Sequence, residues 1–156
     1  MTQLEQFIKQ YQLQPNHLYL LELFPLIEMI WVDGDSQAAE VAILQRYAMQ
    51  RLALLGTNNA GLLPISVDET NDFIDRFMNQ QPSPQMLTDL RGLCLTRLQE
   101  HPDEAYRKAR ADEIINYCLD IAAACAGHYP YEFDERIVAS EKTLLKELIA
   151  ALRPVD

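Results

Sequence analysis

The chain has 156 residues, of which 49% are hydrophobic and 23% are charged. This composition is typical of a globular protein with one sizeable core, and it excludes a chain that is disordered throughout. The formal net charge is −10, which disfavours binding to nucleic acid and to anionic membrane surfaces, because the phosphates of both are also negative. The same charge favours cations, or a partner protein with a basic surface.

Cysteine content and hydropathy predict a cytoplasmic protein without a membrane span. The three cysteines are an odd number without a disulfide-rich pattern, which favours a reducing compartment. The N-terminal residues are polar and amphipathic and lack the apolar segment of a signal peptide. The most apolar run, 18–32, contains Glu22 and Glu28, and it is shorter than the roughly 20 residues that cross a bilayer.

Helical spacing of apolar residues dominates the sequence, so we expect an all-α fold of about seven helices in a single compact domain, 1–156. In the first half of the chain, Pro25 lies within a very apolar segment, and the helix is expected to be bent or interrupted there. Gly34 follows that segment, and glycine accepts the left-handed turn that ends many helices. The helices expected in this half are 2–12, 16–32 with its bend or interruption, and 36–55.

In the second half, capping residues mark the expected helix starts. Ser66 and Glu69 form a Ser-x-x-Glu capping box, in which each side chain bonds the backbone N–H of the other residue. Ser83 precedes Pro84, and proline is favoured in the first turn of a helix. Pro102 is expected to open a long helix in the same way. The helices expected in this half are 66–79, 83–100, 102–127 and 136–152.

Two copies of an Asp-plus-Glu helix start occur in the chain, at 33–44 and 134–145. In both copies Glu follows Asp by seven positions, after a very apolar helix. Glu40 and Glu141 each precede a leucine by four positions, so each lies in line with the apolar stripe of its helix. We therefore expect two pseudo-repeated helix-turn-helix elements, with each glutamate drawn partly out of water.

Two interpretations of these glutamates remain open. A capping box would need Ser, Thr, Asp or Asn three residues before each glutamate, but Gln37 and Val138 stand there. The helix dipole still stabilises an acid in the first turn, typically by about 0.3–1 kcal/mol, and this is a purely structural role. In the second interpretation the two copies approach each other, and their carboxylates share a cation.

The repeated motif resembles that of the TerB-like tellurite-resistance domain family, over 29–40 in the first copy and 134–145 in the second. The resemblance implies a helical, non-enzymatic protein of chemical-stress response. It also implies that acidic residues at the two helix starts hold a divalent metal. The metal ligands that it implies are Asp33, Asp35, Glu40, Asp134 and Glu141.

The chemistry of these residues fits a hard cation. Ligands that are all oxygen favour Ca²⁺, Mg²⁺ or Mn²⁺ over thiophilic metals. The first copy is not an EF-hand, because Ala38 and Leu44 stand where that loop has Gly and Glu. Two residues depart from the family's motif: Ser36 replaces an apolar residue in the first copy, and Glu135 replaces Gly in the second.

Other residue groups carry less specific signals. Cys118, Cys125 and His128 have ligand-like spacing, but a fourth zinc ligand is missing and the cysteines fit core packing. Asp120 and Glu28 are lone charges in apolar helices, either at an exposed edge or in a site. Besides the cation-binding domain, two alternatives remain: a helical interaction module whose acidic face docks a basic protein, and a small hydrolase, for which nothing marks a nucleophile.

Overall fold

The structure is a computed structural model that describes residues 2–32, 38–58, 62–126 and 139–152, with the side chains of 58, 125–126 and 139–142 excepted. Within these ranges the chain forms seven α-helices and one 3₁₀ helix, and no strand. The all-α prediction is therefore confirmed. In chain order the elements are α1 (Gln3–Gln10), η1 (Pro15–Leu23), α2 (Phe24–Trp31), α3 (Ala38–Asn58), α4 (Val67–Asn79), α5 (Pro84–Gln99), α6 (Glu104–Ala126) and α8 (Ala139–Leu152).

The predicted capping residues begin their helices as expected. Ser66 and Glu69 form both hydrogen bonds of the capping box at the start of α4. The Ser83 side chain accepts a hydrogen bond from the Met86 N–H at the start of α5. These bonds satisfy backbone N–H groups that have no partner inside the helix. The starts of α4 and α5 are thus set by local sequence.

The segment 16–32 is interrupted next to Pro25, which was one of the two expected outcomes. The part before the interruption is the 3₁₀ helix η1 rather than an α-helix, and the change to α-helix comes at Phe24. Pro25 lies in the first turn of α2, where its missing N–H costs nothing. The long helix α6 begins at Glu104 rather than at Pro102, because the Asp103 carboxylate accepts a hydrogen bond of 3.0 Å from the Ala105 N–H.

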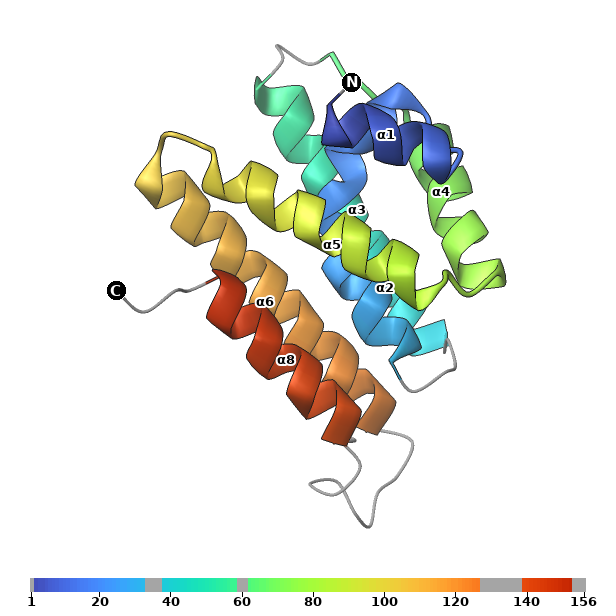
Figure 1. Cartoon of the computed structure of the whole chain (residues 1–156), viewed down its shortest axis with the longest axis vertical. Coiled ribbons are helices and arrows are strands. Elements are labelled where there is room, and N and C mark those ends of the chain that lie inside the picture. The colour runs from blue at the N-terminus through green and yellow to red at the C-terminus, as the bar shows by residue number, and fades with distance from the viewer. Residues whose placement is uncertain (1, 33–37, 59–61, 127–138, 153–156) are drawn as a thin grey trace.

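The short helix α2 lies at the centre of the fold and contacts η1, α3, α5, α6 and α8 (Figure 1). Six of its eight residues are buried, because it is apolar except for Glu28 and such a helix is stable only inside a core. On one side, α6 and α8 run antiparallel beside each other (Figure 1). On the other side, α4 packs against α2 through the rings of Phe24, Phe73 and Phe77.

Candidate functional site

The cation site expected at the two motif copies can be placed only in part. Asp33, Asp35 and Asp134 lie outside the described residues, and so does the side chain of Glu141, whose backbone belongs to α8. Glu40 is described, in the first turn of α3. Among the described side chains, no three His, Cys, Asp or Glu residues cluster as ligands of a metal ion. A cation site would therefore need the motif residues that fall outside the described ranges.

Glu40 is buried, with only 1% of its surface exposed. Its spacing predicts this, because Ile43, Leu44 and Tyr47 follow on the same side of α3 and are buried as well. A carboxylate inside a protein requires hydrogen bonds or an opposite charge to offset the loss of water. Its place in the first turn also puts it near the positive end of the helix dipole.

The two motif helices begin at the same end of the molecule. Figure 1 shows that α2 and α6 end at the lower right, where α3 and α8 begin. Each apolar helix contacts the motif helices of both copies: α2 contacts α3 and α8, and α6 also contacts α3 and α8. The two helix pairs, α2 with α3 and α6 with α8, are therefore neighbours. In both pairs the apolar helix ends, and the motif helix begins, at the same end of the molecule.

A buried group of charges lies in the interior, and no sequence pattern predicted it. The Arg110 guanidinium on α6 donates to Glu22 on η1, to the Tyr47 hydroxyl at 2.8 Å and to Glu113 at 2.6 Å. Arg51 on α3 pairs with the second oxygen of Glu22. The two arginines and two glutamates balance in formal charge. The sequence signal was Glu22 itself, a lone acid within an apolar run.

Burial and charge perturb the tyrosine in this group. Burial, and then the negative charge of Glu22, hold the pKa of Tyr47 well above its usual value of 10.0, although Arg110 and Arg51 oppose the change. The Tyr47 hydroxyl therefore keeps its proton at any physiological pH. It accepts the hydrogen bond from Arg110 and remains a donor.

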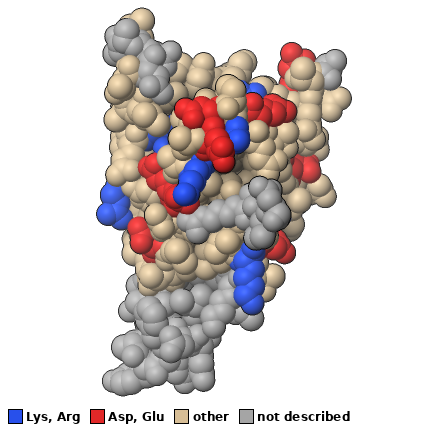
Figure 2. Space-filling model, turned by 90° about the vertical axis from the view of Figure 1, so that its left-hand side faces the viewer, with Lys and Arg blue, Asp and Glu red and all other residues tan. Residues whose placement is uncertain are grey.

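A cavity of about 250 Å³ adjoins this charge group, between η1, α3, α5 and the start of α6. Its lining includes residues where α5 ends and α6 begins, and that is the opposite end of α6 from the motif copies (Figure 1). That side of the molecule carries acidic and basic side chains close together (Figure 2). The polar lining comprises Glu22, Arg51, Arg97, His101 and Tyr106, and the apolar lining includes Leu18, Leu21, Leu55 and Leu98.

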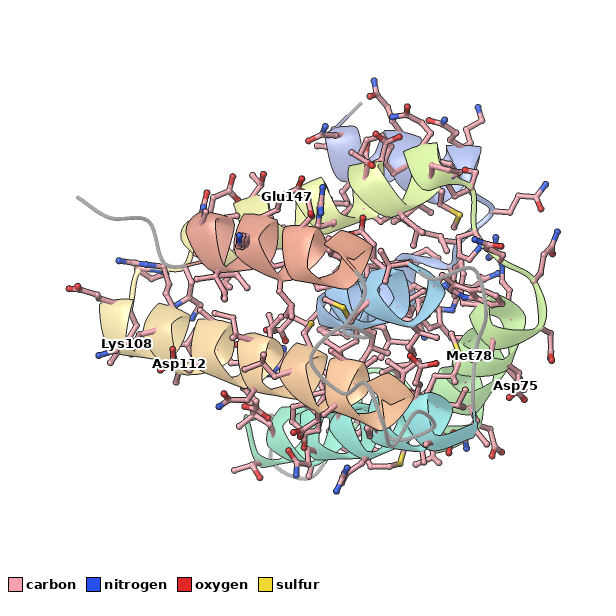
Figure 3. All side chains as sticks on the ribbon, turned by 90° about the horizontal axis from the view of Figure 1, so that it is seen from below. Asp75, Met78, Lys108, Asp112 and Glu147 are labelled. Atoms are coloured by element: carbon pink, nitrogen blue, oxygen red, sulfur yellow. The ribbon has the colours of Figure 1, made fainter. Side chains whose placement is uncertain are left out.

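Glu28, the other lone acid of the apolar run, pairs with Arg91 on α5 at 3.3 Å. Arg91 also reaches Glu147 on α8 at 3.4 Å, and Figure 3 shows Glu147 on the outer side of that helix. Burial raises the pKa of Glu28, and the attraction of Arg91 only partly opposes this. Because three helices meet at Arg91, we assign these residues a structural role.

The remaining candidates have ordinary surroundings. Asp120 is exposed. Cys118 is a free, buried thiol, and burial raises its pKa, so it is a poor source of the thiolate that zinc requires. The other two residues of the zinc alternative, His128 and the side chain of Cys125, lie outside the described residues.

No family model, curated protein or solved structure matches this chain. The likeness to the TerB-like family thus rests on the motif residues alone.

Proposed function

We propose that the chain is a non-enzymatic, TerB-like helical domain that binds a divalent cation, Ca²⁺, Mg²⁺ or Mn²⁺, where α3 and α8 begin. The observation that carries the proposal is the buried carboxylate of Glu40 in the first turn of α3, at the end of the molecule where α8 also begins (Figure 1). The role in stress response rests only on the resemblance of the motif to that of the TerB-like family.

Three physical arguments support cation binding. A carboxylate withdrawn from water is stabilised by a nearby positive charge. Asp33, Asp35, Asp134 and Glu141 belong to the same two helix starts, and their oxygen atoms are the ligands that hard cations prefer. The net charge of −10 also raises the local concentration of cations at the protein.

Thermal unfolding in the presence of metal tests this proposal. At a concentration one hundred times Kd, a bound cation stabilises the fold by about 2.7 kcal/mol, which is a rise of several degrees in Tm for a domain of this size. We expect Asp33→Asn to abolish the rise. The matched control is Asp75→Asn, because Asp75 is exposed on α4 (Figure 3). A Tm that no divalent cation changes would refute the proposal.

A second function is favoured by the outer side of α4. Asp68, Asp72 and Asp75 follow one another at helical spacing and are all exposed. Leu62 is 75% exposed just before this helix, and Leu63 and Val67 are also exposed. Acidic and apolar side chains together suit a basic amphipathic helix of another protein.

Fluorescence polarisation with a labelled Lys- and Leu-containing helical peptide separates this function from the first. We expect binding that weakens as salt is added and that is lost when Asp68, Asp72 and Asp75 are changed together to Asn. Binding without any effect of divalent cations on Tm would favour the interaction module. Binding that is unchanged in the triple variant would exclude α4 as the docking surface.

A further inference from the structure

We propose that the cavity between η1, α3, α5 and α6 binds a small organic carboxylate with a short hydrocarbon chain. This binding site is separate from the proposed cation site, since the two lie at opposite ends of α6 (Figure 1). Each can therefore fail in experiment without the other.

The charge of the cavity lining favours a negative ligand. Arg51 and Arg97 contribute two guanidinium groups, against the single carboxylate of Glu22. In the buried charge group Arg51 and Arg110 balance Glu22 and Glu113, so the positive excess of the lining is the guanidinium group of Arg97. Arg97 forms no ion pair with any residue in the described part of the chain.

Arg51 provides an unused hydrogen-bond donor. Its side chain is only 10% exposed, and its Nη1 finds no acceptor among the described residues. A buried guanidinium N–H without an acceptor is costly, so most such groups in folded proteins have a partner. A carboxylate of a ligand is the acceptor that matches the geometry of a guanidinium group best.

His101 adds a second donor to the lining. Its Nδ1 accepts a hydrogen bond of 3.1 Å from the Asp103 N–H, so in the neutral ring the proton is on Nε2 and that atom donates. The ring is held in place by stacking on Tyr106, with centroids 4.0 Å apart and planes inclined at 22°.

The size and the apolar lining determine the rest of the ligand. The volume of about 250 Å³ far exceeds the space that a single water molecule needs, so the cavity has room for a small organic molecule. Four leucines line the cavity beside the arginines, and they favour a hydrocarbon chain over a second charged group. Hexanoate combines one carboxylate with a chain of suitable size, so it is the probe of choice.

The test compares hexanoate with two probes of the same chain, hexanol and hexylammonium, by isothermal titration calorimetry and by amide chemical shifts in NMR spectra. We expect saturable binding of hexanoate, with shift changes centred on the cavity lining. We expect hexanol to bind at least tenfold more weakly, because it cannot form the charged hydrogen bonds. Hexylammonium should not bind, because the arginines of the lining repel its positive charge.

Two variants test the named donors. Arg97→Gln, at an exposed position, should weaken hexanoate binding about tenfold or more without affecting the fold. Arg51→Lys keeps a positive charge beside Glu22 but removes Nη1, and it should weaken binding to a similar extent. Arg46→Gln is the matched control, because Arg46 lies on α3 like Arg51 but is exposed and does not line the cavity. This variant should bind hexanoate as the wild type does.

The proposal is overturned if hexanoate shows no saturable binding, or if hexanol binds equally well. It is also overturned if Arg46→Gln weakens binding as much as Arg97→Gln does, because the effect would then come from the overall charge of the protein. Chemical shift changes centred away from the lining residues would also overturn the proposal.

Discussion

Arg110 on α6 and Glu22 on η1 are 88 positions apart in the sequence, and the arginine donates two hydrogen bonds to the glutamate, of 3.1 and 3.4 Å. The arginine also bonds Tyr47 on α3, so three elements meet at one guanidinium group. We expect Arg110→Met to destabilise the protein by about 3–5 kcal/mol, because removing one partner leaves other charges buried without compensation. Urea unfolding measures this change.

The control for this variant is Arg46→Met, at an exposed position on α3, which should change the free energy of unfolding by no more than about 0.5 kcal/mol. A loss of stability in Arg110→Met as small as that of the control would show that the buried charge group contributes little to the fold.

Tyr11 ties the end of α1 to α5 through a hydrogen bond of 2.5 Å to Asp89. Partial burial, followed by this bond and the charge of Asp89, raises the pKa of Tyr11 to about 12. Its contribution to stability is therefore present below its unfolded pKa of 10.0 and is lost as the pH rises through about 12. Tyr11→Phe should cost about 1 kcal/mol at neutral pH, and the variant should lack this alkaline loss in denaturation curves measured at several pH values. If Tyr11→Phe lost as much stability at alkaline pH as the wild type, the loss could not be attributed to ionisation of Tyr11.

We expect the ionised carboxylate of Glu28 to lower the stability of the fold, whereas the ionised carboxylate of a stabilising surface acid raises it. Its pKa is raised by burial above the usual value of 4.5, so its stabilising contribution is present below pH 4.5 and is lost as the pH rises through the folded pKa. We therefore expect Glu28→Gln to be at least as stable as the wild type at neutral pH, with an advantage that shrinks as the pH falls toward 4.5.

Glu147→Gln is the matched control for Glu28→Gln, because Glu147 faces the same arginine but is 58% exposed. An exposed ion pair contributes little, so this change should alter stability by less than about 1 kcal/mol at any pH. Strong destabilisation of Glu28→Gln at neutral pH would show that its pairing with Arg91 outweighs its burial.

The capping box of α4 gives a prediction that is independent of the buried charges. Ser66→Ala removes the hydrogen bond of 3.0 Å from the Glu69 N–H to the serine hydroxyl and should cost about 1 kcal/mol in thermal or urea unfolding. Ser66→Asp should retain most of the stability, because aspartate is an equally good capping residue. Equal losses in both variants would indicate that the hydroxyl has another role.

The sequence predicts local features of this fold well and remote ones poorly. Ser66, Ser83 and Pro84 identify the starts of α4 and α5, because capping depends on residues three or four positions apart. The 3₁₀ geometry of η1 escaped prediction, since periodicity does not separate a 3₁₀ helix from an α-helix over so short a segment. The start of α6 was displaced because Asp103 caps it, and Pro102 alone does not reveal this.

The same contrast between local and remote features holds for the candidate sites. The spacing of Glu40 relative to Leu44 predicts its burial, because both lie on one stripe of one helix. The pairing of Glu22 with Arg110 cannot be predicted in this way, because no periodicity in either helix encodes which distant charge will meet it. The cavity depends on four elements at once, so its lining is visible only in the assembled fold.

The late position of α6 in the sequence has a consequence for synthesis. The ribosome produces η1 and α3 before the segment that carries Arg110, so Glu22 then lacks one of its two guanidinium partners, and α2 lacks the helix that covers it. Until residue 110 has emerged, burial of Glu22 has only Arg51 to compensate it. The face of α2 that packs on α6 therefore stays uncovered until α6 has been synthesised, which makes that apolar face a natural point of contact for chaperones.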